Sequence, residues 1–204
     1  MNKLYLDIET LPAGEEMREI LKDIYTRKKK SKYTPRTFEE FVESTGLDGS
    51  YGRIACISYA INDEPIKTLF GDEKKMLTGF LDIAKNADLF IGFNLMDFDL
   101  RFIYQRSVIL DVKPSKDLNF ARYRNFPIYD IMCEWSKWNL QSKISLHALS
   151  KVLGIPSPKE GEIEGKDVAK AYQDGRIKEI CQYCEKDVET TRKIYKKMIY
   201  EKTT

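Results

Sequence analysis

Short runs of apolar and β-branched residues, separated by polar turns, predict the strands of the chain. They cover residues 3–9, 53–60, 65–70, 89–93 and 108–112. The second and third runs flank Asn62-Asp63-Glu64, a sequence typical of a turn. Because residues 89–93 form a continuous apolar run, we expect them to be a buried central strand.

Apolar residues at helical spacing predict the helices. This pattern covers residues 17–25, 76–84, 97–105, 145–153 and 176–200, and a further helix is expected to begin near Asp130. Thr37 and Glu40 predict a capping box for a short helix through Val42. Residues 113–127 predict irregular structure and carry Lys113, Lys116, Arg122 and Arg124. Strands early and helices late indicate an α/β or α+β sandwich.

The composition is that of a globular protein of ordinary size. The chain has 204 residues, 42% of them hydrophobic, and a net charge of only +2, which identifies no partner. We expect one domain over residues 1–204, with a helical, basic insertion at about 13–50. The apolar runs are far shorter than the ~20 residues of a membrane-spanning helix. These features predict a soluble, cytoplasmic protein without a membrane partner.

Two acidic residues lie on the first predicted strand. Asp7 and Glu9 are two positions apart, so their side chains share a face of the strand while Leu6 and Ile8 occupy the other. On a central strand two unpaired carboxylates would repel each other and lose hydration, and a divalent cation would remove both costs. A solvated edge strand explains the pair equally well, because acid-x-acid pairs also arise by chance.

Two further acidic motifs follow in the chain. Residues 92–99 read Gly-Phe-Asn-Leu-Met-Asp-Phe-Asp and place Asp99 at a helix start beyond a predicted strand. In Tyr-Cys-Glu-Lys-Asp, Tyr183 and Asp187 stand at i and i+4 on one helical face. Together with Asp7 and Glu9, these motifs give four acidic residues and one tyrosine.

This set resembles the three motifs of the DEDD-type 3′–5′ exonucleases, and the tyrosine indicates the DEDDy branch. The resemblance spans residues 4–191 and is strongest to the stand-alone predicted exonucleases related to the proofreading domain of family B DNA polymerases. It implies a ribonuclease H-like fold, with a central mixed five-stranded sheet flanked by helices. It also implies removal of 5′-mononucleotides from the 3′ end of nucleic acid. Single-stranded DNA is the expected substrate because the sequence shows no obvious RNA-binding module.

The resemblance further implies a site that holds two divalent cations, Mg²⁺ or Mn²⁺, on four carboxylates. Asp7 would bridge both ions, Glu9 and Asp187 would complete the first site, and Asp99 would help to hold the second. The Tyr183 hydroxyl would orient the attacking water and assist its deprotonation. These five residues are the expected catalytic set, and the four acids among them are the expected metal ligands.

Several alternatives compete for these roles. Asp97 could replace Asp99, although a helix cap also suits it. Glu185 and Glu189 could replace Asp187, but they fall on other faces of the helix. Tyr183 could be a core aromatic residue. The sister DEDDh branch needs a histidine where Gln182 stands, and the only histidine, His147, is expected on the surface at a helix start.

Substrate contacts are expected at three places. By resemblance, Thr10 and Leu11 would contact the terminal nucleotide, with an apolar wedge between bases, and Asn94 would support the site by hydrogen bonding near the 3′ end. The basic run Arg27-Lys28-Lys29-Lys30-Ser31-Lys32 could bind the phosphate backbone, through Lys28, Lys29 and Lys30. A solvated helix end that complements the helix dipole explains the same run.

Two other functions remain open. One is RNA trimming by an enzyme like RNase D, and the other is a catalytically silent nucleic-acid binding module on the same fold. Proofreading or repair would require a separate polymerase or repair partner. Cys181 and Cys184 lack a second cysteine pair for zinc, since Cys56 and Cys133 stand alone in the sequence. Trp135 and Trp138 are expected in the core rather than as a base-stacking platform.

Overall fold

The structure, a computed structural model, describes residues 1–28, 37–114, 116–117, 120–139, 141–157 and 163–201. Its centre is one mixed sheet of five strands in the order β3-β2-β1-β4-β5. The strands are β1 (Lys3–Leu11), β2 (Arg53–Ile61), β3 (Lys67–Phe70), β4 (Leu89–Gly92) and β5 (Ile128–Asp130). β1 pairs with β2 in antiparallel and with β4 in parallel orientation, so the first strand is central. A solvated edge strand is therefore excluded for β1.

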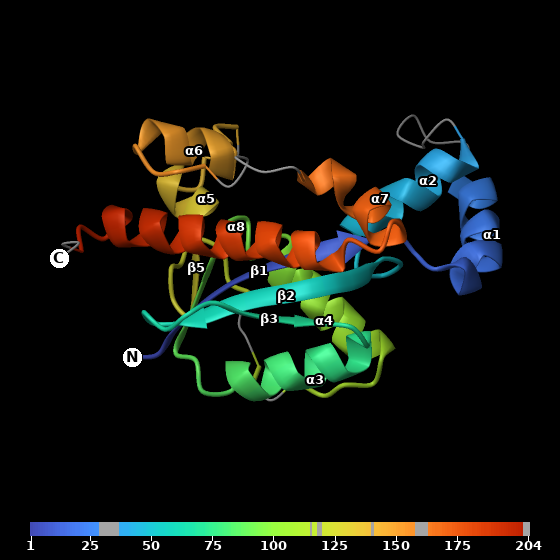
Figure 1. Cartoon of the computed structure of the whole chain (residues 1–204), viewed down its shortest axis with the longest axis horizontal. Coiled ribbons are helices and arrows are strands. Elements are labelled where there is room, and N and C mark those ends of the chain that lie inside the picture. Colours follow the sequence, from blue (N-terminus) through green and yellow to red (C-terminus); the bar gives the residue numbers. More distant parts are fainter. Residues whose placement is uncertain (29–36, 115, 118–119, 140, 158–162, 202–204) are drawn as a thin grey trace.

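Helices cover both faces of the sheet (Figure 1). The long α8 (Ile177–Met198) packs on one face against β1 and β2, while α3 (Glu73–Ala84) covers the other and contacts β2, β3 and α4 (Asp99–Ile109). Leu4, Leu6 and Ile8 of β1 belong to the hydrophobic cluster that contains Met76, Leu77 and Phe80 of α3. The alternation along β1 therefore turns Asp7 and Glu9 to the α8 face.

The described part of the connection from β1 to β2 contains four helical segments. They are η1 (Glu15–Met17), α1 (Arg18–Lys28), α2 (Phe38–Ser44) and η2 (Thr45–Leu47), and α1 and α2 lie beyond the end of the sheet (Figure 1). Leu21, Tyr25 and Phe41 form a small hydrophobic cluster between α1 and α2. Thr37 and Glu40 form the expected capping box at the start of α2.

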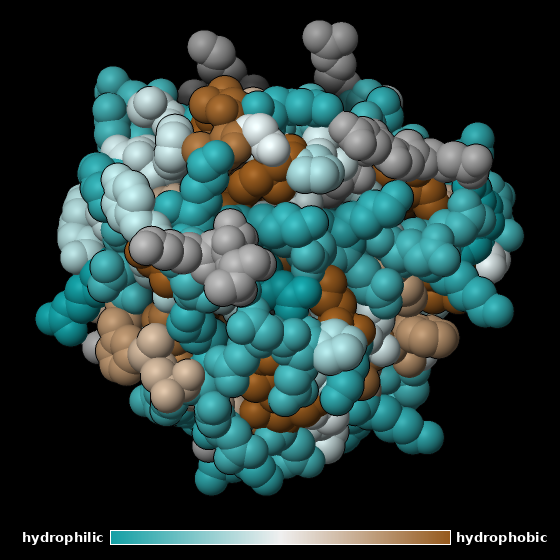
Figure 2. Space-filling view, turned by 60° about the vertical axis from the view of Figure 1, so that its left-hand side comes forward, coloured by the Kyte–Doolittle hydropathy of each residue, from teal (hydrophilic) through white to brown (hydrophobic). Residues whose placement is uncertain are grey.

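The remaining helices lie between β5 and the end of α8. They are α5 (Ile131–Trp135), α6 (Leu146–Val152), η3 (Gly165–Asp167) and α7 (Val168–Gln173). None of the helices within the described ranges has the length and hydrophobicity needed to cross a membrane. Figure 2 shows mostly hydrophilic side chains on the face that it presents, with small hydrophobic patches between them.

The predicted strand at residues 108–112 is wrong. Val108 and Ile109 form the last turn of α4 and are exposed, and only Val112 of that run is a buried core residue. A short apolar run does not distinguish a strand from the end of a helix, because a helix can also end with apolar residues that face solvent. β5 was not predicted, because its three residues are too few to show a period and directly precede a helix.

Candidate active site

β1 presents two carboxylates to α8. Asp7 stands opposite Ser58 of β2, and Glu9 stands opposite Cys56. The Glu9 side chain is buried and Asp7 is half-buried. The thiol of Cys184 on α8 donates hydrogen bonds to the backbone oxygen and to Oδ2 of Asp7, with both distances 3.3 Å. The N-terminal half of α8 is thus held directly against Asp7.

Asp99, from the start of α4, lies beside the same pair of carboxylates. It is the first residue of α4, is 3% exposed, and its Oδ1 accepts a hydrogen bond from the backbone N–H of Ile8 at 3.0 Å. Ile8 lies between Asp7 and Glu9, so the structure brings Asp99 to this pair. Asp97 is instead half-exposed and forms an ion pair with Arg122 at 3.2 Å.

α8 adds Tyr183 and Asp187, one helical turn apart. The negative charge of Asp187 raises the pKa of both Glu9 and Asp99, which places its carboxylate near both. Burial is the main cause of the raised pKa of Tyr183, and the charges of Asp187, Glu9 and Asp7 add to it. The two competing acids on α8 point elsewhere: Glu185 is half-buried and accepts a hydrogen bond from Thr68 at 2.6 Å, and Glu189 pairs with Arg192 and Lys193.

Because the carboxylates are buried close together, it is unfavourable for all of them to be ionised at once. The pKa of Asp7 is raised well above its usual value by burial and then by the charge of Asp99. The pKa of Glu9 is raised by burial and by Asp7, Asp187 and Asp99. For Asp99, burial outweighs the hydrogen bond from Ile8, which lowers the pKa. Buried like charges of this kind are what a bound cation neutralises.

The donor set fits a divalent metal ion. Ligand atoms of Asp7, Glu9 and Cys184 lie within 4.8 Å of one another. Burial raises the pKa of the Cys184 thiol, which favours the protonated form that donates the hydrogen bond to Asp7. The remaining donors are carboxylate oxygens, which are the hard ligands that Mg²⁺ and Mn²⁺ prefer.

The fold gathers three cysteines beside the carboxylates. Cys56 of β2 lies in one buried cluster with Cys181 and Cys184 of α8, and all are free thiols. Cys56 stands alone in the sequence but not in the fold, because β2 and α8 are distant in the chain and pack together. Cys181 and Cys184 are both buried on α8.

Asp130, expected from the sequence only near the start of a helix, belongs to the site region. It ends β5, is 1% exposed, and accepts backbone hydrogen bonds from Asn94, Met96, Met132 and Cys133 at 3.0–3.2 Å. One carboxylate thereby fixes both the loop that leads to Asp99 and the start of α5. The signal in the sequence was an acid at the N-cap position directly after a short apolar run.

Gly92 allows the Asp99 loop to approach β1. A Cβ atom at this position would lie 2.8–2.9 Å from Leu95 side-chain atoms and 3.1 Å from the backbone oxygen of Leu6. Asn94, two residues later, adopts a left-handed backbone with φ of 56°. Close packing of the loop on β1 places Asp99 within hydrogen-bonding distance of Ile8.

The expected substrate residues have varied surroundings. The Thr10 hydroxyl donates to the backbone oxygen of Gly46 at 2.6 Å, and Leu11 is buried in the cluster of Ile163 and Val168. A wedge role for Leu11 stays a prediction and would require its exposure. Lys28 ends α1, whereas Lys29 and Lys30 lie outside the described residues.

Two further expectations concern Asn94 and His147. Asn94 is half-buried beside the Asp99 loop, and its role near a 3′ end stays a prediction. His147 lies on α6, half-buried, with Nδ1 2.5 Å from the Ser157 hydroxyl oxygen. The structure therefore keeps the only histidine of the chain away from the clustered carboxylates.

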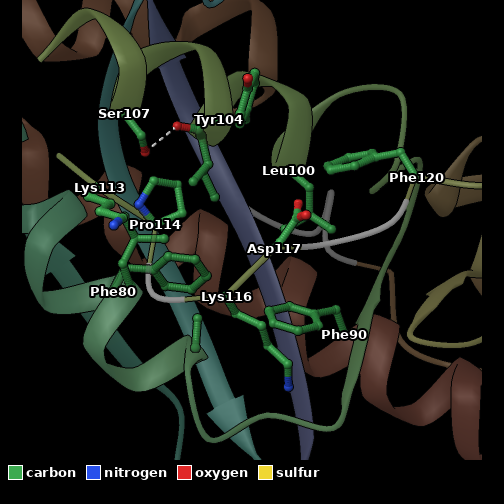
Figure 3. A pocket seen from close by; sticks show the side chains of 13 residues that line it. Phe80, Phe90, Leu100, Tyr104, Ser107, Lys113, Pro114, Lys116, Asp117 and Phe120 are labelled. Atoms are coloured by element: carbon green, nitrogen blue, oxygen red, sulfur yellow. Dashed lines mark hydrogen bonds between the residues drawn. The ribbon is translucent and has the colours of Figure 1, made fainter. Parts of the chain in front are cut away.

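A hydrophobic cavity of about 440 Å³ lies on the other face of the sheet (Figure 3). It is bounded by α3, α4 and residues that follow α4, and Phe80, Leu100 and Phe120 are among its walls. Leu100 faces this cavity whereas its neighbour Asp99 bonds to Ile8. The cavity is thus distinct from the carboxylate cluster.

The chain resembles a described protein family and proteins of two archaea. Residues 48–204 match the family described as predicted 3′–5′ exonucleases related to the exonuclease domain of PolB, a range that includes Asp99, Tyr183 and Asp187. An uncharacterized protein of Methanocaldococcus jannaschii is 25% identical over 167 residues, which are 78% of this chain and 92% of that protein. A DNA polymerase of Archaeoglobus fulgidus is 26% identical over 160 residues, which are 72% of this chain but only 20% of the polymerase.

The fold is also found in a solved polymerase. The structure of the family B DNA polymerase from the hyperthermophilic archaeon Pyrobaculum calidifontis superposes with a TM-score of 0.69 at 16% identity, covering 98% of this chain and 24% of that chain. This likeness shows the fold alone, and it confirms the expected ribonuclease H-like architecture with a mixed five-stranded sheet. The match over most of the chain settles its classification. The chain belongs to the family of predicted 3′–5′ exonucleases related to the exonuclease domain of PolB.

Proposed function

We propose that the protein is a metal-dependent 3′–5′ exonuclease that removes 5′-mononucleotides from single-stranded DNA. The observation that carries this proposal is the convergence of Asp7, Glu9 and Asp99, from β1 and α4, around one buried point. A buried acidic cluster is unfavourable on its own and suits a site that holds cations against phosphate. DNA is favoured over RNA because one relative is a DNA polymerase.

Each residue has a proposed task in this reaction. Asp7, Glu9, Asp99 and Asp187 would hold two divalent cations, which supply positive charge for the phosphate oxygens and acidify a bound water. Tyr183 would position the attacking water with its hydroxyl. The hydrogen bond from the Ile8 N–H keeps Asp99 turned toward the acidic pair. Asp130 would act as a positioning residue through the loop that it binds.

The test is a cleavage assay on single-stranded oligonucleotides labelled at either end, in Mg²⁺, Mn²⁺ or EDTA. Asp99→Asn is the informative variant, because Asn can still accept the Ile8 hydrogen bond while the charge is lost. Asp97→Asn is its matched control from the same loop. We expect a metal-dependent ladder that shortens from the 3′ end and is absent only in Asp99→Asn.

The same assay separates the competing functions. Shortening of RNA in preference to DNA would replace the proposed substrate by RNA. Binding of oligonucleotides without cleavage in any metal would contradict the exonuclease proposal and favour the silent binding module. Equal loss of cleavage in Asp97→Asn and Asp99→Asn would remove the specific role given to Asp99.

A further inference from the structure

Residues 122–126, Arg-Tyr-Arg-Asn-Phe, place aromatic and basic side chains in solvent. Tyr123 is 74% exposed and Phe126 is 59% exposed, and Arg124 is exposed as well. Burial in the core therefore does not explain these aromatic rings. The segment contains two arginines and no acidic residue, so its own net charge is positive.

Tyr123 rests on a second aromatic ring. Its centroid lies 5.3 Å from that of Trp138, with an interplanar angle of 48°. Trp138 is half-buried against the core on the α3 and α4 side of the sheet, and its Nε1 donates to Glu134 at 3.1 Å. Trp138 thus supports Tyr123 from below and leaves most of the Tyr123 ring open to solvent. The expectation that both tryptophans lie in the core is wrong for Trp135, which is 40% exposed.

The backbone at this place is unusual. Tyr123, Lys137 and Trp138 all have positive φ, at 62°, 49° and 64°. Residues other than glycine rarely adopt this conformation, and its presence at a surface is a reason to look for a function. Here it brings the Tyr123 and Trp138 rings together from two segments.

The surface is connected to the carboxylate cluster. Arg122 pairs with Asp97, which lies two residues before Asp99. Asp130 bonds to the loop before Asp99 and to the start of α5, whose C-terminal end leads to Trp138. A strand that lay on this surface would therefore be next to the loop that carries Asp99.

We propose that Arg122, Tyr123, Arg124, Phe126 and Trp138, together the Tyr123 surface, bind the single strand that feeds its 3′ end to the carboxylates. Exposed aromatic rings stack on unpaired bases of any sequence, and arginines bind the phosphates between them. Bases in a duplex are stacked on one another and offer no free face, so the occupant is single-stranded nucleic acid. This inference rests on the proposed exonuclease function.

The test compares a long and a minimal substrate. Binding of a fluorescent single strand of about 12 nucleotides is measured by anisotropy in EDTA, where cleavage does not interfere. Hydrolysis of the p-nitrophenyl ester of thymidine 5′-monophosphate in Mn²⁺ reports the carboxylates alone. Tyr123→Ala should weaken binding of the single strand about tenfold and leave ester hydrolysis unchanged. Tyr123→Phe, which keeps the ring, should bind like the wild type.

The chain offers a close control for Tyr123. Tyr200 is 92% exposed, also has a positive φ of 55°, and lies beyond the far end of α8 from Tyr183. Tyr200→Ala should leave both readouts unchanged. Arg124→Ala should reduce the slope of log affinity against log salt by about 0.7, the value for one phosphate of a single strand, whereas Lys85→Ala on the exposed end of α3 should not.

The outcomes separate the two proposals. If Tyr123→Ala binds the single strand as tightly as the wild type does, the proposed role of the Tyr123 surface is wrong. The same holds if Tyr123→Ala loses equal affinity for single strands and for duplexes. If the wild type hydrolyses neither the ester nor the oligonucleotide, the proposed exonuclease function is wrong. The binding measurement in EDTA needs no cleavage, so it decides on the Tyr123 surface in that case too.

Discussion

At the scale of single residues, the hydroxyl of Tyr183 can be removed without changing any charge. The ring packs beside the cluster that contains Leu11 and Cys181, and the hydroxyl accepts a hydrogen bond from the backbone N–H of Gly165, so Tyr183→Phe should lower the thermal midpoint only slightly. We expect the rate of cleavage to fall about 10²-fold, because the water would lose a positioning hydrogen bond. Initial rates at saturating Mn²⁺ measure the effect.

Tyr172→Phe on α7 is the control for this substitution, since Tyr172 is 40% exposed. An unchanged rate in Tyr183→Phe would show that this tyrosine is only a packing residue.

The sequence predicted several residue positions from local spacing. Two-residue spacing on a strand placed Asp7 and Glu9 on one face, and four-residue spacing on a helix placed Tyr183 and Asp187 together. It could not decide between Asp97 and Asp99 by spacing alone, because the decision depends on a hydrogen bond to Ile8, 91 positions away. Asp130 could be identified from local spacing as a helix cap for Met132 and Cys133, but its bonds to Asn94 and Met96 depend on the proximity of two distant segments that only the fold creates.

At the scale of elements, the close approach of β4 and the Asp99 loop depends on Gly92. Gly92→Ala should lower the free energy of unfolding by about 1–3 kcal/mol, because the added Cβ would collide with Leu95 and the backbone of β1. Cleavage activity should fall as well, since the collision displaces the loop that leads to Asp99. Urea unfolding and cleavage rates provide the two measurements.

Gly79→Ala is the matched control in the middle of α3. A Cβ there would be 3.7 Å from Leu69, an ordinary contact, and alanine favours a helix. This variant should be as stable as the wild type or more stable. If Gly92→Ala changes neither the free energy of unfolding nor the cleavage rate, the loop can shift to accept the added Cβ.

The sequence predicted long elements better than short ones. Four of the five strands and the helices with several apolar turns were found, because their periods extend over enough residues. β5 and α7 have three and six residues and carry little periodic signal. The strand order also depends on pairings between distant segments, such as β1 with β4, which local patterns do not encode.

At the scale of the whole molecule, the acidic cluster makes stability depend on pH and metal. The pKa values of Asp7, Glu9 and Asp99 are raised in the metal-free fold, mainly by burial. Above about pH 4, the ordinary range of carboxyl pKa values, the folded state therefore holds more protons than the unfolded chain. The free energy of unfolding in EDTA should fall as pH rises from there through the raised pKa values.

Urea unfolding at several pH values, with EDTA or Mn²⁺, measures this dependence. Mn²⁺ should stabilise the protein more at pH 8 than at pH 5, because it replaces the lost protons. Asp99→Asn should be less sensitive to pH and to Mn²⁺, while Asp97→Asn should behave like the wild type. A wild-type stability that rises with pH in EDTA would contradict the raised pKa values.

The contact of Cys184 with Asp7 joins positions 177 residues apart. During synthesis, β1 leaves the ribosome long before α8 exists, and the central strand then carries its two acids without Tyr183 or Asp187. A nascent chain would therefore be unable to degrade nucleic acid near the translating ribosome. Because α8 supplies Tyr183 and Asp187 of the proposed catalytic set, the proposed nuclease activity would begin only after α8 has been made and has folded onto β1.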